Sequence, residues 1–224
     1  MKKLCAFVLA VALAFSGAAL AKDHHVTGRV RDAQKAVEHM IQSKYSEGFA
    51  ESVRDSLAVV IFPKVIKAGL IVGGRYGEGL IMRKGPKGDW LGPAFFSISG
   101  GSYGFQVGAS STALVLTVNT KRALDAFRGG SFTLGAEVAA AAGPGGKTGY
   151  VGTTVDGKAP IYSYSLTKGV FAGVALDGSV ISELPGVNDD CWGTHLNNVQ
   201  ILDRASDRAE VRELSRLLSR LAAK

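Results

Sequence analysis

The sequence has 224 residues, of which 46% are hydrophobic and 20% are charged, and its formal net charge is +7. That length suits a single domain with a packed core. The positive charge is modest, so it is compatible with anionic membrane surfaces without being diagnostic of them. Only two cysteines are present, Cys5 and Cys191. If the first leaves with a leader peptide, no internal disulfide can hold the fold.

The first 21 residues have the pattern of a secretory signal peptide. Lys2 and Lys3 precede an apolar run over residues 4–15, and small residues follow up to Ala21. This pattern predicts cleavage after Ala21. A membrane anchor, the alternative, needs about 18 or more apolar residues, and no later segment offers them. We therefore expect residues 22–224 to be exported to the periplasm, either free or associated with the outer membrane. The loss of two lysines would lower the formal charge from +7 to +5.

The new terminus would read Lys22-Asp23-His24. A free amine, two backbone nitrogens and an imidazole could offer Cu(II) the square-planar nitrogen set that it favours. An unstructured terminus is the other interpretation. The sequence does not decide between the two.

Helical spacing follows the leader. Val30, Ala33, Val37, Met40 and Ile41 recur at intervals of three and four residues, which predicts an amphipathic helix. A second series, at positions 49, 53 and 57, continues the pattern before "AVVIFP" changes to strand character. The N-terminal part of the exported chain is therefore expected to be helical.

The central part of the chain, about residues 58–193, is predicted to be a β body. All but three of the 29 glycines lie between Gly69 and Gly193, and they separate short runs rich in Val, Ile, Phe, Tyr and Thr. Short strands divided by turn residues favour a meander of antiparallel strands. The Asp177-Gly178 dipeptide predicts a hairpin turn between two of them.

Two more helices are expected. Residues 120–127 form a short one with Thr120 as its cap. Residues 203–223 form the most regular one, with an apolar stripe of Val211 and four leucines opposite five arginines spaced four residues apart. Such a stripe packs on a protein core or lies in a membrane interface, and packing is favoured here. Together these features predict an α+β fold, with a glycine-rich curved antiparallel sheet or barrel-like body between N-terminal helices and a C-terminal amphipathic helix.

No catalytic or nucleotide-binding motif is complete. "AAGPGGKTG" (141–149) ends like a phosphate-binding loop, but the required first glycine is Ala141 and the following segment is not helical. Cys191 and His195 could form a thiol–imidazole pair, but a single pair at this spacing is more typical of local packing. Spacing for a zinc site or a serine nucleophile is absent. We therefore expect no enzyme activity, no cofactor, no metal site and no nucleotide or nucleic-acid partner.

Several long blocks resemble the SYLF family of lipid-binding domains. They are "AVVIFPKVIKAGLIVGGRYGEGLI" (58–81), "GDWLGPAFFSISGGSYGFQVG" (88–108), "FTLGAEVAAAAGPGG" (132–146), "YSYSLTKGVFAGVALDGSVI" (162–181) and "NDDCWG" (188–193). The resemblance runs from about Ala36 to Gly193, and Cys191 departs from it where the family commonly has an aromatic residue. It implies a non-enzymatic domain that binds membrane lipid, and residues 22–224 would be one such domain. Phosphoinositide and actin binding are features of eukaryotic members and are not carried over.

The residues that would contact lipid follow from chemistry, because lipid binding needs cations for phosphates and apolar groups for the acyl boundary. The segment "FPKVIK" (62–67) supplies both. The predicted site consists of Lys64, Lys67, Arg75, Arg83, Lys84, Lys87 and Trp90. The predicted function is peripheral attachment to anionic phospholipid in the periplasm, with any protein partner unknown. An outer-membrane β-barrel is the alternative, and an exported enzyme the least favoured.

Overall fold

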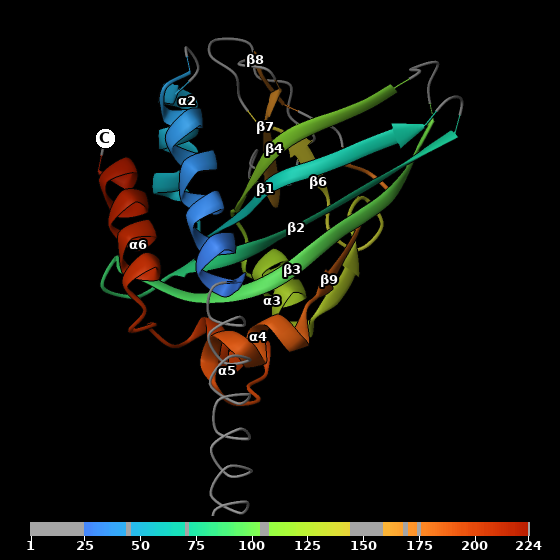
Figure 1. Ribbon diagram of the computed structural model, residues 1–224. Coiled ribbons are helices and arrows are strands. Elements are labelled where there is room, and N and C mark those ends of the chain that lie inside the picture. Colours follow the sequence, from blue (N-terminus) through green and yellow to red (C-terminus); the bar gives the residue numbers. More distant parts are fainter. Residues whose placement is uncertain are drawn as a thin grey trace, which may run out of the picture.

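The computed structural model describes residues 25–43, 46–69, 72–103, 108–143, 159–167, 170–173 and 176–223 (Figure 1). The predicted signal peptide, the Lys22-Asp23-His24 terminus and Lys147-Thr148 lie outside these residues. Residues 25–41 are helical. The further elements are α2 (Ser46–Asp55), β1 (Ala58–Gly69), β2 (Val72–Lys84), β3 (Trp90–Tyr103), β4 (Gly108–Val118), α3 (Lys121–Gly129), β5 (Ser131–Thr133), β6 (Ala140–Ala142), β7 (Ile161–Thr167), β8 (Val170–Gly173), β9 (Val180–Glu183), α4 (Pro185–Trp192), α5 (Asn198–Leu202) and α6 (Ala209–Ala222).

The strands form one strongly curved sheet (Figure 1). Within the described residues its order is β5-β9-β3-β2-β1-β4-β7-β6, and β8 pairs with β7 beside this path. All pairs are antiparallel except β6 with β7. The predicted α+β fold, with helices before and after a curved antiparallel sheet, is confirmed.

Both faces of β1 are buried over residues 58–62, which explains why "AVVIF" is continuously apolar. Successive side chains of a strand point to opposite faces. Val59 and Ile61 therefore enter one core cluster, and Ala58, Val60 and Phe62 enter the other. A strand covered on both faces needs apolar residues at every position, as in "AVVIF".

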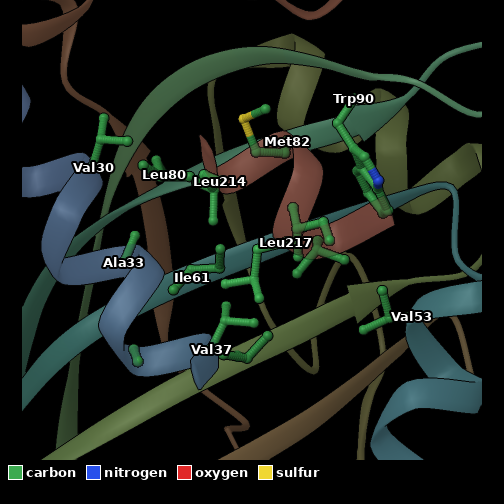
Figure 2. Packing of buried hydrophobic residues seen from close by; sticks show 14 of the residues in the cluster. Val30, Ala33, Val37, Val53, Ile61, Leu80, Met82, Trp90, Leu214 and Leu217 are labelled. Atoms are coloured by element: carbon green, nitrogen blue, oxygen red, sulfur yellow. The ribbon is translucent and has the colours of Figure 1, made fainter. Parts of the chain in front are cut away.

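The first core cluster lies under the helix over residues 25–41, α2 and α6. Figure 2 shows Val30, Ala33 and Val37 of the first helix meeting strand residues and Leu214 and Leu217 of α6. The apolar stripe of α6, namely Val211, Leu214, Leu217, Leu218 and Leu221, is buried. The expectation that this stripe packs on its own sheet is thus confirmed.

The second cluster lies on the opposite face, where α3 and α5 cover the sheet and the strands β5 and β9 of the same sheet contribute residues. Phe127 of α3 packs edge-to-face against Phe96 of β3 and Phe132 of β5. Thr120 caps α3 by accepting a hydrogen bond from the amide of Ala123, as predicted. α4 is fixed on β3 because the Asn188 side chain accepts a hydrogen bond from the Phe95 amide.

Two local predictions differ from the structure. The C-terminal helix was expected from residue 203 but begins at Ala209, because the preceding segment is extended against the sheet. There the Gly92 amide donates to the carbonyl of Arg204, and Gly92 forms a bridge with Ala205. Asp177-Gly178 is a turn with Gly178 at φ 74°, but it makes no hairpin. β9 pairs with β3 and β5, and β8 pairs with β7.

Candidate functional site

The seven predicted site residues lie at the two ends of the β1–β2 hairpin and do not form one patch. In the strand register Lys67 is opposite Arg75, whereas Arg83 is opposite Ala58. Nine residues of β1 separate these positions, which corresponds to roughly 30 Å along a strand. We call the end that carries Lys64, Lys67 and Arg75 the distal end, and the end that carries Arg83, Lys84, Lys87 and Trp90 the proximal end. One lipid headgroup cannot contact both.

Most of the proximal residues have structural partners. Trp90 is only 3% exposed and belongs to the first core cluster, so its ring is not available to a membrane surface (Figure 2). Arg83 donates to the carbonyl of Leu202 and forms an ion pair with Asp203. Lys84 donates to the carbonyl of Arg54 at 2.8 Å, near the C-terminal end of α2, where a cation is favourable. Lys87 is exposed in the turn between β2 and β3.

A β-bulge shapes the distal end. Ile61 pairs with Leu80 and Lys64 pairs with Glu78, so Phe62 and Pro63 lie opposite the single residue Gly79. Such a two-against-one arrangement bends the strand and redirects its side chains. Phe62 and Val65 remain buried in the second core cluster, and Lys64 is exposed. The bulge therefore marks where β1 changes from core strand to surface strand.

Lys67 and Arg75 are direct cross-strand neighbours of like charge. Such a pair is destabilising unless an anion compensates it. Burial, and for Lys67 also the nearby Arg75 charge, lowers the pKa of both side chains from their ordinary values. The Nε and Nη1 atoms of Arg75 are buried and have no hydrogen-bond partner among the residues that the structure describes.

Sequence reasoning missed Tyr76, which is 51% exposed. It lies opposite Ile66, which is 46% exposed, and the two side chains form an apolar pair on one face of the distal end. The signal in the sequence was a lone aromatic residue in a glycine-rich segment, two positions from Glu78 on the same face. The apolar part of "FPKVIK" that reaches the surface is thus Ile66 and not Phe62 or Val65.

A cleft of about 350 Å³ separates this apolar pair from the helix over residues 25–41. Arg29 of that helix forms an ion pair with Glu78, and the Tyr76 hydroxyl donates to Glu78 at 2.6 Å. Burial alone would raise the pKa of Glu78, but the hydrogen bonds from Tyr76 and Arg29 outweigh it and lower the pKa. Glu78 is therefore held as an anion that neutralises Arg29, and Lys64 also lines the cleft.

Cys191 and His195, the pair considered in the sequence, lie on α4 and just after it. His195 is exposed and hydrogen-bonds Asp189 at 3.0 Å, whereas Cys191 is buried on α4. No three His, Cys, Asp or Glu side chains in the described part of the chain are grouped as a metal site requires. None of the helices in that part is long and apolar enough to cross a membrane.

These features define an α+β domain in which helices cover both faces of a curved sheet. Its exposed apolar pair and three cationic side chains lie at the distal end of one hairpin. The family model Ysc84, described as Las17-binding protein actin regulator, matches residues 99–221, which is more than half of the chain. The chain belongs to this family, which is the SYLF family. The description is that of a binding protein and regulator.

Three similar proteins illustrate the relationship. SH3 domain-containing protein PJ696.02 of Schizosaccharomyces pombe is 36% identical over 165 residues, covering 70% of this chain and 38% of its own length. The human SH3 domain-containing YSC84-like protein 1 is 33% identical over 162 residues, covering 71% and 47%. LAS seventeen-binding protein 3 of Saccharomyces cerevisiae is 34% identical over 141 residues, covering 62% and 31%. The chain thus spans less than half the length of these relatives.

Proposed function

We propose that this domain attaches peripherally to anionic membrane lipid through the distal end of the β1–β2 hairpin, in an exported location such as the periplasm, without catalysing a reaction. One observation carries the proposal. The exposed Ile66–Tyr76 pair shares one face of the distal end with Lys64, and Lys67 and Arg75 lie on the opposite face of the same end. Cations for phosphates next to apolar side chains for the acyl boundary are what interfacial binding requires.

The expected strength follows from these groups. Each Lys or Arg near an anionic surface contributes about 1 kcal/mol, so three of them give about 3 kcal/mol. Ile66 and Tyr76 are each about half exposed, so their further burial adds about 1 kcal/mol apiece. The sum, roughly 5 kcal/mol, corresponds to weak attachment. Because more than half of it is electrostatic, we expect binding to fall as salt is raised.

Co-sedimentation with liposomes tests the proposal. The purified protein is mixed with vesicles of neutral phosphatidylcholine or of phosphatidylcholine with phosphatidylglycerol, and the pelleted fraction is measured. We expect pelleting only with the anionic vesicles. Lys64→Glu should reduce it about tenfold or more, since it removes one cation and adds one anion. Ile66→Ser should reduce it by a smaller factor.

Lys87→Glu is the matched control, because it makes the same charge change on an exposed lysine at the proximal end of the same hairpin. Unchanged pelleting of this variant, with loss in Lys64→Glu, would support the distal end. The reverse pattern would move the site to the proximal end. No pelleting of the wild-type protein with either vesicle would overturn lipid attachment.

Binding to a protein partner is the second candidate function. The observation that favours it is the family description, Las17-binding protein actin regulator, together with the name LAS seventeen-binding protein 3 of one relative. Co-sedimentation of the purified chain with actin filaments, without lipid, tests whether this chain binds actin directly. Saturable pelleting with filaments would support it. Its absence, with lipid binding intact, would leave lipid attachment as the function.

A further inference from the structure

Arg75 has a cation and a glycine as its cross-strand neighbours. Lys67 lies directly opposite it on β1, and Gly100 lies directly opposite it on β3. Directly opposite residues of antiparallel strands share one face of the sheet. This is the face opposite the Ile66–Tyr76 pair, because neighbouring residues of a strand alternate between faces.

Ser179 packs closely over Gly100 on this face. A Cβ atom at position 100 would be 3.3 Å from the Ser179 hydroxyl oxygen and 3.2 Å from the Ser179 Cα. Ser179 is fully buried, and within the described part of the chain its hydroxyl oxygen has no hydrogen-bond partner. Buried hydroxyl groups are normally satisfied, so an unpartnered one beside an unpartnered guanidinium indicates a missing ligand.

The missing ligand must be an anion. The two cations have no carboxylate partner among the described residues, and burial disfavours their charged forms. Lys67 and Arg75 both remain partly exposed, so the site is open to the surface at the distal end. Two positive charges and a hydroxyl donor complement a doubly charged oxyanion better than a single carboxylate.

We propose that Lys67 and Arg75, assisted by the Ser179 hydroxyl, bind one phosphate-class oxyanion on the face of the sheet opposite the Ile66–Tyr76 pair. The guanidinium and the ammonium hold the charge, and the hydroxyl donates to one oxygen. The phosphate is either the headgroup of a lipid or a soluble phosphate monoester. In the first case the site rests on the proposed function and supplies its headgroup selectivity. In the second it is an independent site.

Calorimetric titration of the purified protein with sn-glycerol 3-phosphate, in phosphate-free buffer, tests the site without any membrane. We expect saturable binding of one ligand per chain. Arg75→Gln should weaken it about tenfold or more, because it removes a charge-assisted hydrogen-bond donor. Lys87→Gln, the matched control at the exposed proximal end, should leave the affinity within about twofold.

Folding of the variant is checked by urea unfolding in the same buffer. Arg75→Gln removes repulsion from Lys67, so its unfolding midpoint should equal or exceed that of the wild-type protein. If Arg75→Gln does not fold, Lys67→Gln takes its place in the titration. Absence of saturable binding by the wild-type protein, or equal affinity in the folded variant, would overturn the site.

Vesicles distinguish the two sources of phosphate. Phosphatidic acid exposes a phosphate monoester, whereas phosphatidylglycerol exposes only a diester. Stronger pelleting with phosphatidic acid at matched surface charge, reduced by soluble glycerol 3-phosphate, would identify a headgroup site. Glycerol 3-phosphate binding that leaves pelleting unchanged would identify a site for soluble phosphate. A wild-type protein that binds glycerol 3-phosphate but no vesicle would contradict the proposed function and leave this site standing.

Discussion

Gly79 is the residue whose replacement most directly tests the distal bulge. It is the single residue of β2 that lies opposite two residues of β1, Phe62 and Pro63. A Cβ atom added at Gly79 would overlap the carbonyl oxygen of Ile61 and come within 2.7 Å of the Phe62 ring. The overlapped atom belongs to the backbone, so it cannot move away as the end of a side chain can. Gly79→Ala must therefore shift one of the two strands.

The magnitude follows from two opposing effects. Overpacking of this kind costs typically 1–3 kcal/mol, and a backbone contact places Gly79→Ala at about 3 kcal/mol. Replacing a strand glycine by alanine recovers about 0.5–1 kcal/mol of conformational entropy. The net expected loss of unfolding free energy is about 2 kcal/mol. With a slope of about 2 kcal/mol per molar urea, the unfolding midpoint should fall by about 1 M.

Gly74→Ala is the matched control, since Gly74 lies on the same strand and a Cβ there would meet nothing within 4 Å. It gains the same entropy without the overlap, so its midpoint should equal or slightly exceed that of the wild-type protein. The assay is urea unfolding followed by both circular dichroism and tryptophan fluorescence. If Gly79→Ala unfolds at the same urea concentration as Gly74→Ala, the bulge does not require glycine and the reasoning is wrong.

Two further predictions concern the attachment of α6. Leu218→Ala, at a fully buried position of the first core cluster, should lower the unfolding free energy by about 2–5 kcal/mol. Arg216→Ala, at an exposed position, should change it by no more than about 0.5 kcal/mol. Equal urea midpoints for the two variants would show that α6 is not packed as described. Glu210 accepts hydrogen bonds from Arg208 at 2.7 Å and Thr27 at 3.0 Å; burial alone would raise its pKa, but these bonds and its backbone bond outweigh burial and lower it. A carboxylate with a lowered pKa contributes stability that is present above its ordinary pKa of about 4.5 and is lost as pH falls through the folded-state pKa. The stability of the wild-type protein should therefore drop more steeply on acidification than that of Glu210→Gln. Parallel pH profiles of the two proteins would contradict this.

Local sequence patterns correctly predicted several helices, because helix formation depends mainly on neighbouring residues. The spacing of Val30, Ala33 and Val37 predicted the first helix, and Thr120 predicted the start of α3. The leucine stripe predicted the buried face of α6. These succeed because helix periodicity and capping depend on residues within four positions of one another. The same applies to the turn at Asp177-Gly178, which formed although its hairpin did not.

Strand pairing and the candidate site depend on contacts distant in the sequence. The strand after Gly178, β9, pairs with β3 and β5, which are distant from it in the sequence. Local sequence patterns do not determine such a pairing. Residues 204 and 205 do not join the last helix because they contact Gly92. Spacing alone therefore overestimated the length of the last helix.

The sequence by itself determined the α+β class, the helices at both ends, and a set of cations and apolar residues compatible with lipid. Only the tertiary structure decided which of these residues act together. It buried Trp90, paired Arg83 with Asp203, and placed Lys67 opposite Arg75. The physical reason is that a strand fixes only the alternation of its side chains. Register, bulges and the covering helices decide which alternate positions reach the surface.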